Sequence, residues 1–271
     1  MLNSLFEYQF LTNAIIAIIL TSILCGIIGT YIVTNRMVFL SGGITHASFG
    51  GLGIAWFLGI NPILGAAVFS ILAALGIEFF TERGNVRQDS MIGIWWSLGM
   101  AIGIIFIYLT PGYTPNLMNY LFGSILSIEH ADLIMSAILT VLVLLFFTLF
   151  IRPIQFISFD SEYAKTHGIK ISLFKYTLIS LVALTIVFSI KVAGIVLIIS
   201  LLTIPQAIAN LFTTNYIRIM GYSIIIAFIG SLAGLIGSWY INIPSGASII
   251  LALSLLFIIA KLFFWIFRKN N

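Results

Sequence analysis

Residues 10–33 have the sequence FLTNAIIAIILTSILCGIIGTYIV, an apolar run that contains no charged side chain. The hydrocarbon core of a bilayer is crossed by a helix of roughly 20 such residues, so this run predicts a transmembrane helix. The preceding segment, residues 1–9, contains Glu7 but no lysine or arginine. A cleaved signal peptide has a basic start and a short apolar core. We therefore expect residues 10–33 to remain in the mature protein.

The rest of the chain has the same apolar character. Of its 271 residues, 61% are hydrophobic and only 7% are charged, against about 25% charged in a soluble domain. So few charges cannot cover a water-facing surface, which excludes an ordinary soluble domain and a disordered chain. No basic segment is interleaved with aromatic residues, so nucleic-acid binding is not indicated. The single cysteine, Cys25, excludes an internal disulfide and a cysteine-based metal cluster.

Eight further apolar stretches follow, each close to the length needed to cross a bilayer. They lie at about residues 37–59, 62–80, 91–109, 133–151, 171–190, 192–212, 219–240 and 247–267. The boundary near Lys191 is the weakest because two stretches nearly fuse there, so eight or ten spans also fit the pattern. The sequence predicts an all-α integral membrane protein, a polytopic bundle of about nine transmembrane helices that forms a single domain over residues 1–271.

The basic residues predict an orientation for these spans. With the amino terminus outside and the spans alternating, only Lys191 lies outside. The inside then contains Arg36, Arg83, Arg87, Arg152, Lys165, Lys170, Lys175, Arg218, Lys261, Arg268 and Lys269. Cytoplasmic loops of membrane proteins carry an excess of lysine and arginine. We therefore expect an external amino terminus and a cytoplasmic carboxy terminus.

Two ionisable residues inside predicted spans are candidates for function, because such groups are costly in a membrane. His46 lies about ten residues into the second span, which places it about 15 Å deep. Glu78 lies near the inner end of the third span. The two helices are antiparallel neighbours joined at Asn61-Pro62, so we expect the side chains to approach within several ångströms, as ligands for a divalent transition metal. Alternatively, His46 bonds a backbone carbonyl and Glu78 lies at the headgroup level beside Arg83.

The segment around His46 is unusually rich in glycine. Gly42, Gly43, Gly50 and Gly51 expose backbone on a predicted helix, which suits close helix packing or the approach of a ligand. Together with His46, they favour a substrate path over packing alone. Further along, Pro205 lies inside a predicted span and is expected to kink it.

A polar segment over residues 159–168 predicts a short amphipathic helix on the inner side. Asp160 or Ser161 can cap its start, Glu162 favours its first turn, and Gly168 can end it. Such a helix docks into a groove of another protein, or alternatively lies at the lipid surface.

The sequence contains none of the enzymatic motifs that would act here. It has no Gly-x-x-x-x-Gly-Lys-Ser/Thr phosphate loop, no His-Glu-x-x-His pair and no Gly-x-Ser-x-Gly elbow. The outer cluster of Glu129, His130 and Asp132 has ligand-type side chains, but as near neighbours in a loop they are more typical of a helix start.

Several short motifs occur in a fixed order along the chain. They are Arg36-Met37 with Ile44-Thr45-His46-Ala47, Asp89 to Gly93, Tyr120 to Gly123, the Ala164/Gly168 spacing, Gly194 to Leu202 with Ile204-Pro205, and Pro244 to Ala247. On these motifs the sequence resembles, over nearly its whole length, the membrane permease subunits of bacterial ABC importers for zinc, manganese or iron. One position departs from that pattern, since Gly42 stands where the family has an aspartate four residues before the histidine.

The resemblance implies a mechanism and a set of partners. Two copies of the chain form a pathway in the bacterial cytoplasmic membrane. Each copy docks a cytoplasmic ATP-binding subunit, which holds the ATP, through Asp160, Glu162, Ala164 and Gly168. An extracytoplasmic binding protein delivers the ion, and the chain itself binds no cofactor.

The departure at Gly42 leaves the metal open. In this interpretation His46 and Glu78 are the metal ligands, with Glu78 compensating for the missing aspartate, while Gly42, Gly43, Gly50 and Pro205 shape the pathway. Two alternatives also fit the sequence, an ABC permease for a metal chelate or vitamin and an ion-coupled secondary transporter. A membrane enzyme is disfavoured by the missing motifs.

Overall fold

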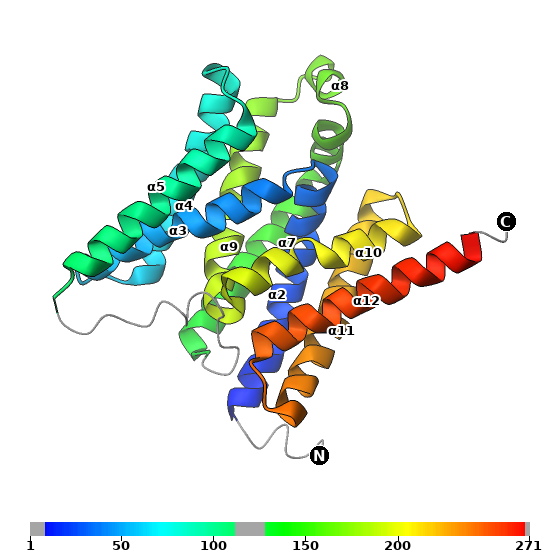
Figure 1. The fold of residues 1–271 in the computed structure, drawn as a ribbon. Coiled ribbons are helices and arrows are strands. Elements are labelled where there is room, and N and C mark those ends of the chain that lie inside the picture. The colour runs from blue at the N-terminus through cyan, green and yellow to red at the C-terminus, as the bar shows by residue number, and fades with distance from the viewer. Residues whose placement is uncertain (1–8, 112–127, 269–271) are drawn as a thin grey trace. The chain divides into compact units, whose positions relative to one another are not determined.

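The computed structural model describes residues 9–111 and 128–268, and every element within these ranges is a helix (Figure 1). The helices are α2 (Gln9–Thr34), α3 (Val38–Phe57), α4 (Pro62–Arg83), α5 (Gln88–Leu109), α7 (His130–Phe159), α8 (Ser161–Thr166), α9 (Ile171–Leu201), α10 (Ile204–Phe212), α11 (Tyr216–Ile241) and α12 (Ser245–Arg268). Nine segments of the described chain are long and apolar enough to cross a membrane. The predicted all-α, polytopic architecture is therefore confirmed.

The described residues form two compact units. One contains residues 9–35, 128–149 and 191–268, and the other contains residues 36–111 and 150–190. We describe each unit by itself. The single transmembrane domain expected over residues 1–271 stays a prediction.

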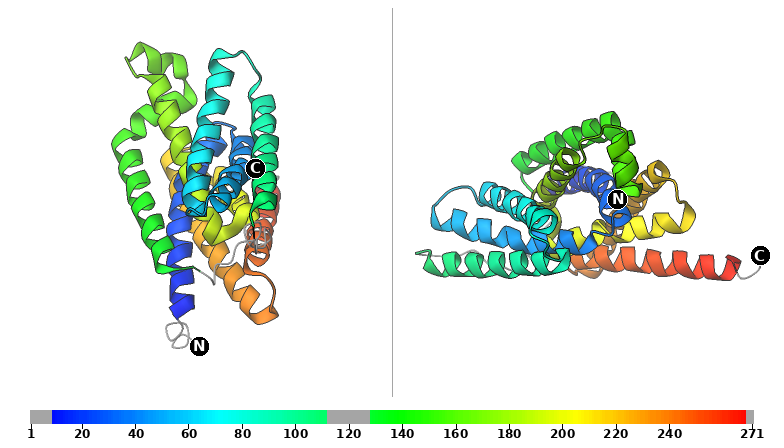
Figure 2. Two further views of the ribbon diagram at one scale, coloured as in Figure 1. Left: turned by 90° about the vertical axis from the view of Figure 1, so that its left-hand side faces the viewer. Right: turned by 90° about the horizontal axis from the view of Figure 1, so that it is seen from above.

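In the second unit, α3 packs against α4 and α5, and the three helices run side by side in Figure 2. The contacts are made by small residues, which let backbones approach closely. A Cβ atom added at Gly99 of α5 would lie 2.5 Å from the Cα atom of Ala47 in α3. On the other side of α3, Gly51 lies against the backbone of Gly65 in α4. Larger side chains at these positions would force the helices apart.

Helix α3 is the least apolar of the nine candidate spans and the most buried. The most apolar window of α3 has a mean hydropathy of 1.2 and is 78% buried, whereas that of α12 has a mean hydropathy of 2.7 and is 11% buried. The polar and small residues of α3 are therefore covered by protein, while most of α12 is exposed apolar surface of this chain.

In the first unit, α11 packs against α2, α10 and α12. Helix α11 is capped by the preceding residue, Asn215, whose side-chain oxygen accepts hydrogen bonds from the backbone N–H groups of Ile217 and Arg218, both at 3.1 Å. The contact with α12 is fixed by Ser248, whose hydroxyl donates to the carbonyl oxygen of Gly234 at 2.7 Å. This hydrogen bond satisfies the hydroxyl group, for which lipid chains offer no hydrogen-bond partner.

Helix α9 ends before the proline that was expected to kink it. It continues through Lys191, is non-helical at Gly194 (φ 76°, ψ 163°), and ends at Leu201. Pro205 then lies in the first turn of α10, where a residue without an N–H group costs little. The candidate span that contains Pro205, Ala193–Phe212, is therefore interrupted, but the break lies two to three residues before the proline.

Gln206 holds this break in place. Its Nε2 atom donates to the carbonyl oxygens of Cys25 in α2, at 2.7 Å, and of Leu201, at 3.3 Å. Gly29 of α2 leaves room for the amide, since a Cβ atom added there would lie 2.7 Å from the Gln206 Cδ atom. The amide thus satisfies a carbonyl that the end of α9 leaves without a helical partner.

Helix α7 is longer than the predicted span at residues 133–151, because it continues to Phe159. It is non-helical at Phe150 (φ −114°, ψ 20°), three residues before Pro153. A proline inside a helix removes one backbone hydrogen bond and clashes with the preceding turn, which explains the kink.

Candidate functional site

His46 lies in the middle of α3 with its imidazole half-buried. The ring stacks on the indole of Trp96 in α5, with ring centroids 4.2 Å apart and planes 6° from parallel. Its Nδ1 atom is buried and has no hydrogen-bond partner among the residues that the structure describes. The alternative that His46 bonds a backbone carbonyl is therefore not supported at Nδ1.

The glycines beside His46 bring its ring to α5. Gly43, Ala47 and Gly50 follow at helical spacing, and they lie against Ile92 and Gly99 of α5. A Cβ atom added at Gly50 would lie 3.1 Å from the Gly99 carbonyl oxygen. Neighbouring helices therefore fill the space beside Gly43 and Gly50, which supports close packing at these two glycines rather than an opening for an ion. Gly42 is also buried.

Glu78 is 5% exposed and belongs to a charged cluster between α4 and α9. Its Oε1 atom lies 3.7 Å from Nζ of Lys175, and Oε1 of Glu82 lies 3.5 Å from the same nitrogen. The hydroxyl of Tyr176 donates to Oε2 of Glu82 at 3.4 Å. The Glu78 carboxylate is therefore paired with Lys175, a partner that the sequence analysis did not identify.

The register of the α3–α4 hairpin separates His46 from Glu78. Gly51 lies opposite Gly65 in this antiparallel pair, so His46 is level with a residue near position 70. Glu78 lies about eight residues further along α4, which is about 12 Å at 1.5 Å per residue. This offset along the helix axis does not favour the expected approach of the two side chains, and the ion pair of Glu78 is with Lys175.

No complete metal centre is formed by the described residues. In residues 9–111 and 128–268, no group of three or more His, Cys, Asp or Glu side chains is placed to hold a metal ion. A transport pathway does not require such a centre, because an ion that binds too tightly is not released.

The short helix α8 has the predicted ends. The side chain of Asp160 accepts a hydrogen bond from the backbone N–H of Tyr163 at 2.9 Å. At the other end, Gly168 has a positive φ of 74°, and the N–H of Ile169 donates to the carbonyl oxygen of Ala164 at 3.2 Å. This is how a glycine terminates a helix.

Ala164 does not lie on the exposed face of α8. It is 0% exposed, so this chain's own residues already cover it. The exposed residues of α8 include Glu162, Tyr163 and Lys165. The ring of Tyr163 lies 4.1 Å from that of His167. A docking partner would therefore contact a polar and aromatic surface, whereas Ala164 packs against other residues of this chain on the buried face of α8.

The cluster at the start of α7 is built into a helix end. Asp132 accepts a hydrogen bond from the backbone N–H of Glu129 at 3.1 Å, and Nε2 of His130 lies 2.9 Å from Nε2 of Gln9. Asn13 donates to the carbonyl oxygen of Ile128 at 3.2 Å. These contacts match the helix-start interpretation. The motif Tyr120 to Gly123 lies outside the described residues.

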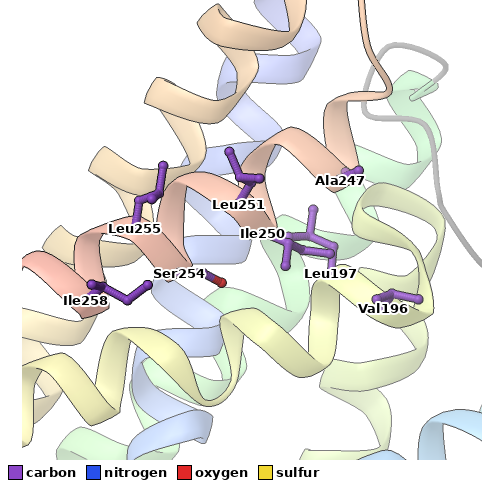
Figure 3. A pocket seen from close by; sticks show the side chains of 9 residues that line it. Val196, Leu197, Ala247, Ile250, Leu251, Ser254, Leu255 and Ile258 are labelled. Atoms are coloured by element: carbon purple, nitrogen blue, oxygen red, sulfur yellow. The ribbon is translucent and has the colours of Figure 1, made fainter.

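An apolar cleft of about 470 Å³ lies between the end of α9 and helix α12 (Figure 3). Val196 and Leu197 line one side, and Ile250, Leu251 and other residues of α12 line the other. Ser254 is its only residue with a polar side chain. The cleft therefore offers no ligand set for a metal ion.

Two residues at these sites were missed by the sequence analysis. Trp96 lies in the stretch Gly93-Ile94-Trp95-Trp96 of a predicted span. Aromatic residues are common in such apolar stretches, so their presence alone does not indicate a site. Lys175 was counted among the inner basic residues, and its position at the inner end of a span was the available signal for a carboxylate partner. Neither contact follows from the sequence without the helix register.

Comparisons with known proteins agree over nearly the whole chain. The profile of the ABC 3 transport family matches residues 7–264. An uncharacterised membrane protein of Synechocystis is 39% identical, over 95% of this chain and 92% of its own length. The manganese transport system membrane protein MntC of Listeria monocytogenes is 32% identical, over 97% and 93%. The solved structure of PsaBC from Streptococcus pneumoniae in complex with Fab superposes with a TM-score of 0.85 at 30% identity, over 96% and 93%.

Proposed function

Because the chain belongs to the ABC 3 transport family, we propose that it is the permease subunit of an ATP-binding-cassette importer for a divalent transition-metal ion. The observation that carries this proposal is the agreement of the family match, over residues 7–264, with nine segments able to span a membrane in the described parts of the chain. The chain is a multi-pass membrane protein and a transport subunit rather than an enzyme.

The metal class follows from the named relatives. The protein of Listeria monocytogenes is named as a manganese transport system component, as is the manganese import permease ScaB of Streptococcus parasanguinis, which is 32% identical. Manganese is therefore the first metal to test, with zinc and iron as further members of the class. An imidazole such as that of His46 suits zinc and iron, and manganese also accepts oxygen ligands.

His46 is the residue of this chain that we assign to the ion. It lies inside a span, where an ionisable side chain faces a polar pathway or a partner. Its Nδ1 atom is buried without a hydrogen-bond partner among the described residues, so the ion is assigned to the other ring nitrogen, Nε2. Glu78 is assigned a structural role instead, since Lys175 already balances its charge.

The partners are proposed from the same reasoning. Two copies of the chain enclose the pathway, and an external binding protein delivers the ion. Each copy docks an ATP-binding subunit, which carries the ATP, on the exposed residues of α8. The chain is located in the bacterial cytoplasmic membrane. Its amino terminus lies outside, because that orientation places eleven of the twelve Lys and Arg residues inside.

Uptake by a reconstituted complex tests this function. The permease is purified with its ATP-binding subunit, placed in liposomes, and supplied with Mn²⁺, Zn²⁺ or Fe²⁺ and the binding protein. We expect accumulation of a free metal ion that requires ATP on the ATPase side. Accumulation driven by an ion gradient without ATP would contradict the proposal and favour a secondary transporter. Uptake of a metal chelate or vitamin but no free ion would equally contradict it.

A further inference from the structure

His46 and Trp96 form a stacked pair of rings between α3 and α5. The two rings are parallel within 6°, with centroids 4.2 Å apart. Trp96 is itself half-buried in α5. Its ring also lies near Phe39, with the two ring centroids 6.1 Å apart. Trp96 therefore stacks on one face of the imidazole.

A histidine that binds a metal needs a fixed ring orientation. In most metal sites the second ring nitrogen provides it, by donating a hydrogen bond to a carboxylate or a carbonyl. At His46 that bond is missing for the buried Nδ1 atom among the described residues. Stacking on Trp96 is the contact that remains to define the plane of the ring.

The stack also responds to charge. The face of an indole is electron-rich and attracts cations, more strongly than the face of a phenyl ring. An imidazole gains positive character when a metal ion coordinates it. The indole of Trp96 therefore stabilises the metal-bound form of His46 more than the empty form.

We propose that Trp96 is a positioning residue for the ion site of His46, which sets the plane of the imidazole and raises its affinity for the transported metal. The inference rests on the proposed function of His46. It predicts an effect on ion binding that is larger than the effect on turnover, because Trp96 acts on the ligand and does not drive the ATPase cycle.

The chain supplies a matched control in the preceding residue. Trp95 is also half-buried in α5, but its ring contacts Phe69 at 6.3 Å and lies against Gly76 of α4. Trp95→Leu therefore removes the same amount of side chain from the same helix and leaves the His46 stack in place.

The experiment compares Trp96→Leu, Trp96→Phe and Trp95→Leu in the reconstituted complex, with His46→Ala as reference. For Trp96→Leu we expect the KM for the metal to rise about tenfold, with kcat changed by less than about twofold. Trp96→Phe keeps a ring of weaker attraction and should raise KM about threefold. Trp95→Leu should keep the wild-type KM, although its apparent Tm in detergent falls by as much as that of Trp96→Leu.

The outcomes distinguish the two proposals. If His46→Ala transports at the wild-type rate, the assignment of His46 to the ion fails. If His46→Ala abolishes transport while both Trp96 variants keep the wild-type KM, the inference about Trp96 fails alone. Equal increases in KM for Trp95→Leu and Trp96→Leu would also overturn it. Should Trp96→Leu not fold, the KM of Trp96→Phe against the wild type decides the question.

Discussion

The contact between α3 and α5 and the contact between α4 and α9 both carry an ionisable side chain, but they treat it in opposite ways. At the first, His46 is surrounded by glycines and an indole, and its Nδ1 atom has no hydrogen-bond partner among the described residues. At the second, Glu78 is paired with Lys175, and Glu82 shares the same ammonium group.

The difference follows from the charge of each group. A carboxylate in a protein interior is very costly unless it is paired, so Glu78 requires Lys175. A neutral imidazole costs less when one nitrogen lacks a partner, so His46 can remain in the span with Nδ1 unpaired among the described residues while Nε2 is the nitrogen assigned to the ion. An ionisable residue in a span is therefore a candidate binding site only where no neighbouring side chain already pairs with it.

The close approach of α3 and α5 is the feature whose removal should have the largest effect. A Cβ atom added at Gly99 would meet the backbone of Ala47, whereas one added at Gly93 of the same helix meets nothing within 4 Å. We expect Gly99→Ala to destabilise the protein by about 3 kcal/mol, because backbone must move. Gly93→Ala should change stability by less than about 0.5 kcal/mol. Thermal unfolding in detergent measures both, and equal effects would mean that the α3–α5 contact is looser than described.

Substitution of His46 and of Glu78, one at a time, should affect transport to different extents. His46→Ala should lower metal uptake by about 100-fold, the upper range for disturbing a metal site, while the folded yield stays close to wild type. Glu78→Gln keeps the shape of the side chain and should lower uptake by less than about threefold. Uptake that depends on Glu78 and not on His46 would reverse the assignment made for the two regions.

A smaller effect is expected from breaking the charged contact. Lys175→Met leaves Glu78 buried without its partner, and we expect a loss of about 2 kcal/mol, below the usual cost because Lys175 is partly exposed. Adding Glu78→Gln to that variant should recover most of the loss, since no charge then remains unpaired. Glu82→Gln alone should cost only a few tenths of a kcal/mol. Detergent melting curves of the wild type, Lys175→Met, Glu78→Gln, the double variant and Glu82→Gln test this, and an additive double variant would show that the pair is not coupled.

The nine spans could be predicted from the sequence because hydropathy is a local property. Their ends were less predictable. The boundary expected between two spans near Lys191 agrees with the candidate spans Ile171–Ile190 and Ala193–Phe212. Helix α9 nevertheless runs across this boundary with a non-helical residue at Gly194, and a second break follows Leu201, before Pro205. The sequence marks every glycine and proline in this stretch, and it does not tell which of them interrupts the backbone.

The candidate site could be predicted only in part. His46 was identified because an ionisable residue in an apolar stretch is visible in the sequence, and so was the Asp160 cap of α8. The contacts of His46 with Trp96 and of Glu78 with Lys175 depend on helix register and on neighbours distant in the chain. The burial of Ala164 likewise depends on residues outside its own helix.

The low hydropathy of α3 bears on how this protein enters its membrane. A helix that moves from the translocon into lipid by itself, without other helices, does so according to the hydropathy of its own side chains. Helix α3 carries many glycines and hydroxyl groups together with His46, and its mean hydropathy of 1.2 is the lowest of the nine candidate spans. The residues that cover it in the second unit belong largely to α4 and α5, which the ribosome makes later. We therefore expect insertion of residues 38–109 to be a joint event, in which α3 is retained in the bilayer by helices that are synthesised after it.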